Sequence, residues 1–176
     1  YRKIRNTFRF ILGNLQDKFE QQDFEKIKIN SFSELERHIL GKLFDLDNSI
    51  KENLKNYNFH KLYKELLNFC NLDLSSFYFD IRKDVLYCDD LDSEKRKNCI
   101  IVLNIILECL LKWLAPIFVF TTEEIFNLLN KNENSIHETA YPEIPKNWKD
   151  NKLDQKWKDL LEIKQVVNIA IEEKRS

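Results

Sequence analysis

Two glycines and three prolines in 176 residues leave this chain few places at which it can turn sharply. β-sandwiches and doubly wound sheets need many more glycines in their turns, so the sequence favours helices. Apolar side chains make up 43% of the residues, which is enough to fill a core, and charged side chains make up 32%, which suits a hydrated surface. The sequence therefore predicts one all-α domain over residues 1–176, a helical bundle of five to six helices.

Apolar residues spaced three and four apart, together with helix-start signals, divide the chain into segments. Ser33 with Glu36 and Thr121 with Glu124 have the form of a capping box, with Ser31 as an alternative start for the earlier helix. We expect helices at about 1–17, 34–56, 59–72, 93–113, 121–130 and 154–176. The helix at 93–113 is apolar around much of its circumference, so we expect it to be central.

Two stretches have less regular patterns. Residues 75–87 fit a short helix or an extended turn, and we expect a helical start and an irregular end. Residues 131–153 hold Pro142 and Pro145 and are interpreted as a long surface connection between a core bundle (1–130) and the terminal helix (154–176). In that helix we expect an inward-facing stripe of Trp157, Leu160, Leu161, Val167 and Ile171.

Residue types that carry catalysis occur in no recognisable arrangement. His38, His60 and His137 are scattered, and the sequence has no nucleophile motif or phosphate-binding glycine loop. No two of the four cysteines are closer than ten residues, a spacing that does not suit zinc. We therefore predict no catalytic residue and no metal site. The lack of any methionine suggests a piece of a longer protein, and without a leader or long apolar run we expect a cytoplasmic location and no membrane contact.

The first sixteen residues hold four cations and no acid, in a chain whose net charge is −1. At helical spacing, cations share one side of the helix with Asn6 and Gly13, opposite an apolar stripe. The cations of this stripe are Arg2, Arg5 and Arg9, and Lys3 is the fourth cation of the helix. Such a face suits phosphates and the bases of a single-stranded RNA loop. The alternative is a solvated face whose arginines pair with acids of a neighbouring helix, and Arg5, nearest the apolar edge, is the residue we expect to pair in this way.

A second candidate contact is the pair Arg82 and Lys83, which follows the aromatic residues Phe77, Tyr78 and Phe79. Cations beside aromatic rings can clamp and stack nucleotides. Aromatic residues at helical spacing are more often part of a core, and that interpretation stays open for this cluster. The cations at 95–97 are interpreted as a solvated face.

Several separated segments resemble the anticodon-binding domain of bacterial isoleucyl-tRNA synthetases, the helical type found in class I synthetases. The segments are YRKIRNTFRFILGNL (1–15), ELERHILGKL (34–43), YNFH (57–60), LSSFYFDIRKDVLY (74–87) and WLAPIFVFTTEEI (113–125). His38 departs from the family, in which an aromatic residue is more usual. The first segment and the one at 74–87 favour the isoleucine over the valine enzymes, and the same domain of a valyl-type synthetase is the alternative.

The resemblance implies a parent ligase that charges tRNA(Ile) with isoleucine using ATP. The catalytic, editing and zinc modules would lie elsewhere in that parent, so we expect no cofactor in these residues, and ATP, Mg and Zn only in the other parts. The implied partners are the anticodon stem-loop of tRNA(Ile) and the catalytic domain of the same chain. On the matching first helix, the resemblance suggests phosphate contacts from Arg2, Lys3 and Arg9, and a base or ribose contact from Asn6.

Two other functions are weighed against this one. A helical protein-interaction bundle could use the same arginine face to meet an acidic protein partner. A free-standing small enzyme has no set of residues to support it, so whether these residues alone act as an enzyme is left open, and activity is expected only of the parent ligase.

Overall fold

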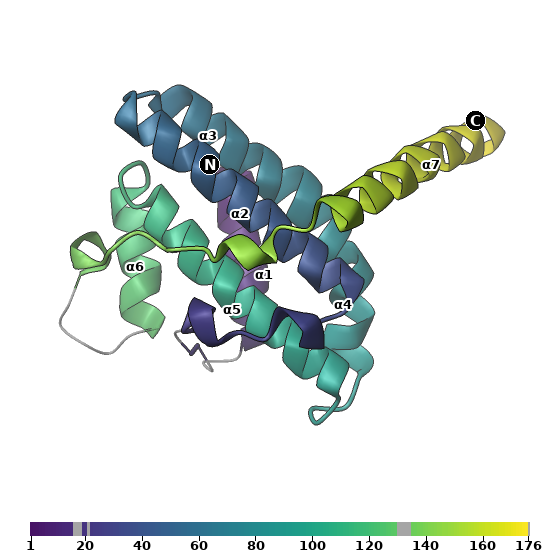
Figure 1. The fold of residues 1–176 in the computed structure, drawn as a ribbon, viewed down its shortest axis with the longest axis horizontal. Helices are drawn as coiled ribbons and strands as arrows, with labels where there is room; N and C mark the ends of the chain where they lie inside the picture. The colour runs from purple at the N-terminus through teal and green to yellow at the C-terminus, as the bar shows by residue number, and fades with distance from the viewer. Residues whose placement is uncertain (16–18, 21, 130–134, 176) are drawn as a thin grey trace.

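A computed structural model of the chain describes residues 1–15, 19, 20, 22–129 and 135–175 (Figure 1). Within these residues the chain forms helices joined by turns and contains no strand, which confirms the predicted all-α bundle. The main elements are α1 (Arg2–Leu15), α2 (Glu34–Lys55), α3 (Phe59–Asn68), a π-helical segment (Phe69–Tyr78), α4 (Phe79–Cys88), α5 (Glu94–Leu114), α6 (Val119–Leu129) and α7 (Asn151–Arg175). Short 3₁₀ helices occupy Phe24–Lys26, Ile29–Ser31, Ile136–Glu138 and Lys146–Trp148.

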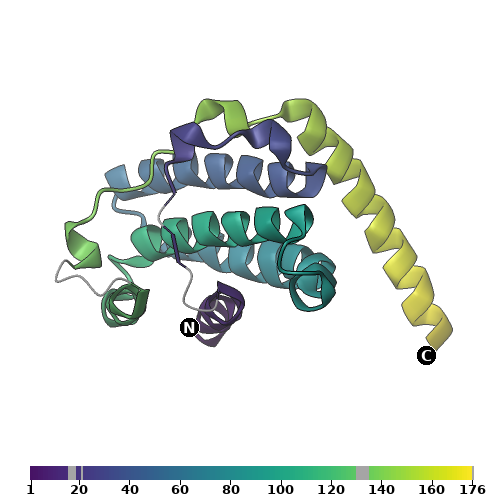
Figure 2. The ribbon, with the colours of Figure 1, turned by 90° about the horizontal axis from the view of Figure 1, so that it is seen from below.

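α5 is the central helix, as its apolar sequence predicts. Every residue from 102 to 111 is buried, and α1, α2, α4 and α6 all contact this helix. Figure 2 shows α5 between α2 on one side and α1 on the other. The outer surfaces of α1 and α2 therefore face opposite sides of the bundle.

Residues 59–88 form one continuous helical rod, so the predicted end near Leu72 and the irregular end of 75–87 are both wrong. The π-helical segment in its middle has wider turns than an α-helix. These turns direct three consecutive aromatic residues, Phe77, Tyr78 and Phe79, towards the core, and all three are buried. Three successive aromatic residues fit neither the 3.6-residue period of an α-helix with one buried face nor the alternation of a strand, so the local pattern is ambiguous.

The two predicted capping boxes have different outcomes. Ser33 is the N-cap residue of α2, but its hydroxyl donates to the Glu36 carboxylate and does not cap the backbone. α6 begins at Val119, two residues before the predicted start, so the Thr121 capping box is wrong. The backbone is already helical there, because the amide of Thr122 donates to the carbonyl of Phe118 at 2.9 Å.

The segment between α6 and α7 is more than a surface connection. Residues 130–134 lie outside the described part of the chain, but from residue 135 onward the segment buries Ile136, Ile144 and Trp148 in the core. Gly41 of α2 lets this segment approach closely, since a Cβ there would meet the carbonyl oxygen of Trp148 at 3.3 Å. The helix that follows begins at Asn151, slightly before the predicted start.

α7 packs against the bundle through its first half, where the Trp157 ring stacks on His38 with centroids 5.4 Å apart and the Lys164 ammonium lies 5.6 Å from the centre of the Phe77 ring. Its C-terminal half projects away from the body (Figures 1 and 2). The inward positions predicted for Leu160, Val167 and Ile171 are therefore wrong, since these side chains are 43%, 48% and 43% exposed. Their helical spacing is regular, but these three side chains are turned towards solvent.

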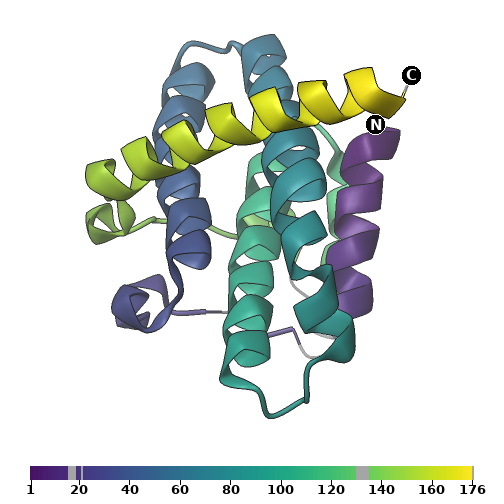
Figure 3. The same cartoon turned by 90° about the vertical axis from the view of Figure 1, so that its right-hand side faces the viewer.

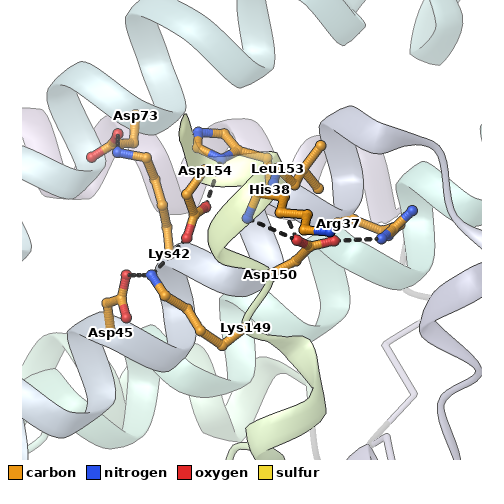
Figure 4. A network of polar contacts seen from close by, with 10 residues as sticks. Arg37, His38, Lys42, Asp45, Asp73, Lys149, Asp150, Leu153 and Asp154 are labelled. Atoms are coloured by element: carbon orange, nitrogen blue, oxygen red, sulfur yellow. Dashed lines mark hydrogen bonds and ion pairs between the residues drawn. The ribbon is translucent and has the colours of Figure 1, made fainter. Parts of the chain in front are cut away.

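Ion pairs concentrate where α7 meets α2 (Figure 4). His38 and Lys149 both contact Asp154, at 3.2 and 2.6 Å, and Lys149 also pairs with Asp45. Arg37 of α2 lies 2.9 Å from Asp150. Positive and negative groups therefore neutralise one another on the side of the bundle that faces away from α1 (Figure 2).

Candidate nucleic-acid interface on the first helix

The buried stripe of α1 fixes which way the helix faces. Ile4, Phe8, Ile11 and Leu15 are at most 2% exposed and belong to the core. Beside this stripe, the Phe10 ring stacks on Phe79 of α4, with centroids 4.2 Å apart and planes 17° apart. Figure 3 shows α1 running alongside the rod formed by α3 and α4. These two sets of contacts fix the orientation of α1 about its own axis. The face of α1 opposite the buried stripe is therefore directed outward.

That outward surface, the cationic face, consists of Arg2, Lys3, Arg5, Asn6, Arg9 and Gly13. All six residues are exposed, so the sequence-based prediction of an exposed basic ridge agrees with the structure. Among the described residues, no carboxylate lies within ion-pair distance of Arg2, Lys3 or Arg9. Within the described part of the chain, no ion pair neutralises these three cations, an arrangement typical of a surface that binds a polyanion.

Arg5 has a partner, but a different one from the acid predicted for it. Its Nη1 donates to the hydroxyl of Tyr1 at 3.2 Å, and its guanidinium carbon lies 6.0 Å from the centre of that ring. The pKa of the Tyr1 phenol is lowered, first by its hydrogen bond with Thr121 and further by the nearby Arg5 charge. Because the partner of Arg5 is a phenol hydroxyl and not a carboxylate, the contact is no ion pair, and Arg5 adds its positive charge to the cationic face.

Arg82 is directed into the interior, where an RNA could not reach it. It is 6% exposed, and its Nε and Nη2 donate to the two carboxylate oxygens of Glu36 at 2.5 and 2.8 Å. Nη2 also donates to the Ser33 hydroxyl at 2.9 Å. Arg82 thus ties α4 to the start of α2, and we leave it out of the candidate interface.

The Lys83 side chain is directed towards solvent and is 51% exposed. It pairs with Asp80 at 2.9 Å, and the carboxylate of Asp80 is itself 57% exposed. Such a surface pair is screened by water and salt and holds its partners weakly. Lys83 therefore stays a candidate contact, on a helix that lies next to α1.

The spacing of buried residues around Arg82 indicates its inward position. Arg82 is separated by three or four residues from Tyr78, Val85 and Leu86, all of which are buried. This spacing places Arg82 on the inward stripe of α4, whereas its neighbour Lys83 falls on the outer side.

The predicted absence of catalytic groups and metals can be compared with geometry only in the described part of the chain. Among those residues, no three His, Cys, Asp or Glu side chains come together in a way that could hold a metal ion. His38 of α2 is buried where it contacts the first turns of α7, while His60 and His137 are exposed and lie on other elements. No helix in the same part of the chain is both long enough and apolar enough to span a membrane.

Comparison with known proteins gives this helical bundle a family. Residues 36–176 match the family described as the anticodon-binding domain of tRNA ligase, and the chain belongs to that family. α1 precedes the matched region, but individual relatives extend the similarity over it.

Those relatives are isoleucine–tRNA ligases. The enzyme of Pelagibacter ubique is 56% identical over 176 residues, which is all of this chain and 19% of the relative. The enzyme of Agrobacterium fabrum is 39% identical over 175 residues, covering 99% of this chain and 18% of the relative. That of Brachyspira hyodysenteriae is 38% identical, covering 99% and 19%. The chain thus spans about a fifth of the length of these curated relatives.

Proposed function

We propose that this chain is the module of an isoleucine–tRNA ligase that binds the anticodon stem-loop of tRNA(Ile). The family match supports an anticodon-binding domain, and the names of the relatives favour the isoleucine over the valine enzyme. The observation that carries the proposal is the cationic face of α1, on which Arg2, Asn6 and Arg9 are exposed and without carboxylate partners among the described residues.

The chemistry of that face matches an RNA loop. Guanidinium groups one helical turn apart can contact successive phosphates, which position the RNA without reading its sequence. Asn6 lies between Arg2 and Arg9 and can both donate to and accept from a base edge. Lys83 on the neighbouring α4 extends the basic surface. Charging of the tRNA with ATP, and the Mg and Zn that it needs, would belong to other parts of the ligase, whose catalytic domain is the second proposed partner.

The test is a salt titration of stem-loop binding. Arg2→Ala and Arg9→Ala should each weaken binding by about 1 kcal/mol, because each removes a phosphate contact. Each should also reduce the slope of log affinity against log salt by about 0.7, the contribution of one contact to a single strand. Arg37→Ala is the matched control, since Arg37 pairs with Asp150 on the opposite side of the bundle.

Competition separates RNA binding from a protein-interaction function. Unlabelled tRNA should displace a labelled stem-loop, whereas an acidic peptide of equal charge should not. An unchanged salt slope in both α1 variants would contradict the proposal. Displacement by the acidic peptide would favour the protein-interaction bundle instead.

A further inference from the structure

Arg5 is held in place by a neighbouring side chain, which distinguishes it from the other arginines of the cationic face. Its Nη1 donates to the Tyr1 hydroxyl at 3.2 Å, and its guanidinium carbon lies 6.0 Å from the centre of the Tyr1 ring. Within the described part of the chain, Arg2 and Arg9 have no side-chain partner. All three arginines are exposed, so they differ in order and not in access to a ligand.

Tyr1 can hold Arg5 because Tyr1 is itself anchored at the start of α6. Its hydroxyl lies 3.1 Å from Oγ1 of Thr121, and since the phenol oxygen accepts from Arg5, its own proton can be donated to Thr121. The Tyr1 ring packs edge-on against Phe118, with centroids 5.5 Å apart, and Phe118 also contacts the ring of Tyr63 on α3. A chain of contacts therefore runs from α6 through the phenol of Tyr1 to the guanidinium of Arg5.

The contact with Tyr1 leaves most of the Arg5 guanidinium available. An arginine carries five N–H donors, and the bond to Tyr1 uses one donor on Nη1. The donors on Nε and Nη2 can still bind two oxygens of one phosphate at the same time. In Arg82, by contrast, Nε and Nη2 are both occupied by the Glu36 carboxylate. Tyr1 thus orients the guanidinium of Arg5 without neutralising it or blocking its edge.

The order of a side chain in the free protein affects how tightly it binds. A long side chain that is mobile before binding has to be immobilised by the ligand, which weakens binding by roughly two- to tenfold for each such side chain. A side chain that is already held in position loses less conformational freedom. Arg5 should therefore contribute more to binding than Arg2 or Arg9, although all three carry the same charge.

We propose that Tyr1 is a positioning residue, which orients Arg5 for a bidentate contact with one phosphate of the bound RNA. The inference rests on the proposed function, because the bound stem-loop supplies the phosphate. Tyr1 acts through Arg5 in this proposal and makes no contact with the RNA. Thr121 and Phe118 fix Tyr1, so the start of α6 contributes to the RNA surface of α1 from beneath it.

The experiment measures binding of the 176-residue chain to an anticodon stem-loop over a range of salt concentrations. Tyr1→Phe removes the hydroxyl but keeps the ring and the charge of Arg5. It should weaken binding by roughly two- to fivefold, because part of the order of Arg5 is lost. Its slope of log affinity against log salt should stay unchanged, because no cation is removed.

Arg5→Ala shows whether Tyr1 acts through Arg5. This variant should reduce the salt slope by about 0.7, the contribution of one phosphate contact to a single strand. In the Arg5→Ala background, Tyr1→Phe should have no further effect on affinity, because the group that Tyr1 positions is gone. A structural role of the Tyr1 hydroxyl would weaken binding to the same extent in both backgrounds.

Tyr141→Phe is the matched control, because Tyr141 is 40% exposed, similar to 52% for Tyr1, and lies on the segment before α7. It should bind the stem-loop as the unmodified protein does. Circular dichroism checks that every variant is folded.

Three results would overturn the positioning role of Tyr1. They are unchanged binding by Tyr1→Phe, an equal loss on Tyr1→Phe with and without Arg5, and an unchanged salt slope in Arg5→Ala. With any of them, reduced slopes in Arg2→Ala and Arg9→Ala would leave the proposed function standing. A chain that binds no stem-loop at any salt concentration would overturn both inferences.

Discussion

Arg82→Leu should destabilise the protein severely without touching its RNA surface. Arg82 and Glu36 are 6% and 2% exposed, so the substitution leaves the Glu36 carboxylate buried without its cation. Removing one partner of a buried ion pair costs about 3–5 kcal/mol. A domain of this kind has a total stability of about 5–15 kcal/mol, so the loss is a large fraction of it.

The adjacent residue provides the control for this prediction. Lys83→Leu removes a cation of the same sign one position away, but Lys83 and its partner Asp80 are each more than half exposed. The free energy of unfolding should change by less than about 0.5 kcal/mol in this variant. The double variant Arg82→Leu with Glu36→Leu should regain most of the lost stability, because it leaves no unpaired charge in the interior.

The assay is urea unfolding followed by circular dichroism. Stem-loop binding is measured separately, without urea, at a temperature at which every variant is folded. The reasoning is refuted if Arg82→Leu unfolds at the same urea concentration as the unmodified protein and instead binds RNA with a reduced salt slope. That result would mean that the guanidinium reaches the RNA and that its pairing with Glu36 contributes little.

Two further predictions concern the core and its response to pH. Phe8→Ala should lower the free energy of unfolding by about 3–5 kcal/mol in urea melts, because the ring is 1% exposed, whereas Phe120→Ala, at 90% exposed, should leave the melt unchanged. Burial, and secondarily the nearby Lys42 charge, lower the pKa of His38 below its ordinary value of 6.5. Just below pH 6.5, His38 therefore binds a proton more readily in the unfolded chain than in the folded chain. The free energy of unfolding should therefore fall as the pH drops through about 6.5. Urea melts from pH 7.5 to 5.5 should show that His38→Gln loses this pH dependence. His60→Gln, a change at an exposed histidine, should keep it.

Helix positions could be read from the sequence because they depend on local spacing. α2 and α5 each carry apolar residues three and four apart over five or more turns, and a signal of that length is hard to mistake. The sequence does not reveal the continuous rod from 59 to 88, because its middle is a π-helix, whose period differs from the 3.6-residue period of an α-helix. The exposed half of α7 was missed for the opposite reason: its spacing is regular, but whether a stripe is covered depends on a neighbour that spacing does not reveal.

In the candidate site, too, some residue positions follow from one local pattern and others depend on distant segments. The cationic face of α1 follows from one helix alone, since a single amphipathic pattern places Ile4 and Phe8 inside and therefore Arg2 and Arg9 outside. The role of Arg82 follows from two segments 46 residues apart, because Glu36 decides it.

The openness of the cationic face has a cause in the fold. α1 contains no acid, and the core residues it packs against are apolar side chains of α5 and the π-helical segment, so within the described ranges no carboxylate of these elements pairs with the cations of α1. Several acids are paired elsewhere in the described residues: Glu36 binds Arg82 between α2 and α4, and Asp150 and Asp154 bind cations where α7 meets α2. Neutralised pairs produce little field at a distance, whereas the unpaired guanidinium groups of α1 do. A chain of net charge −1 can therefore attract a polyanion to one side, and it is the pairing of the acids, more than the total charge, that determines which side.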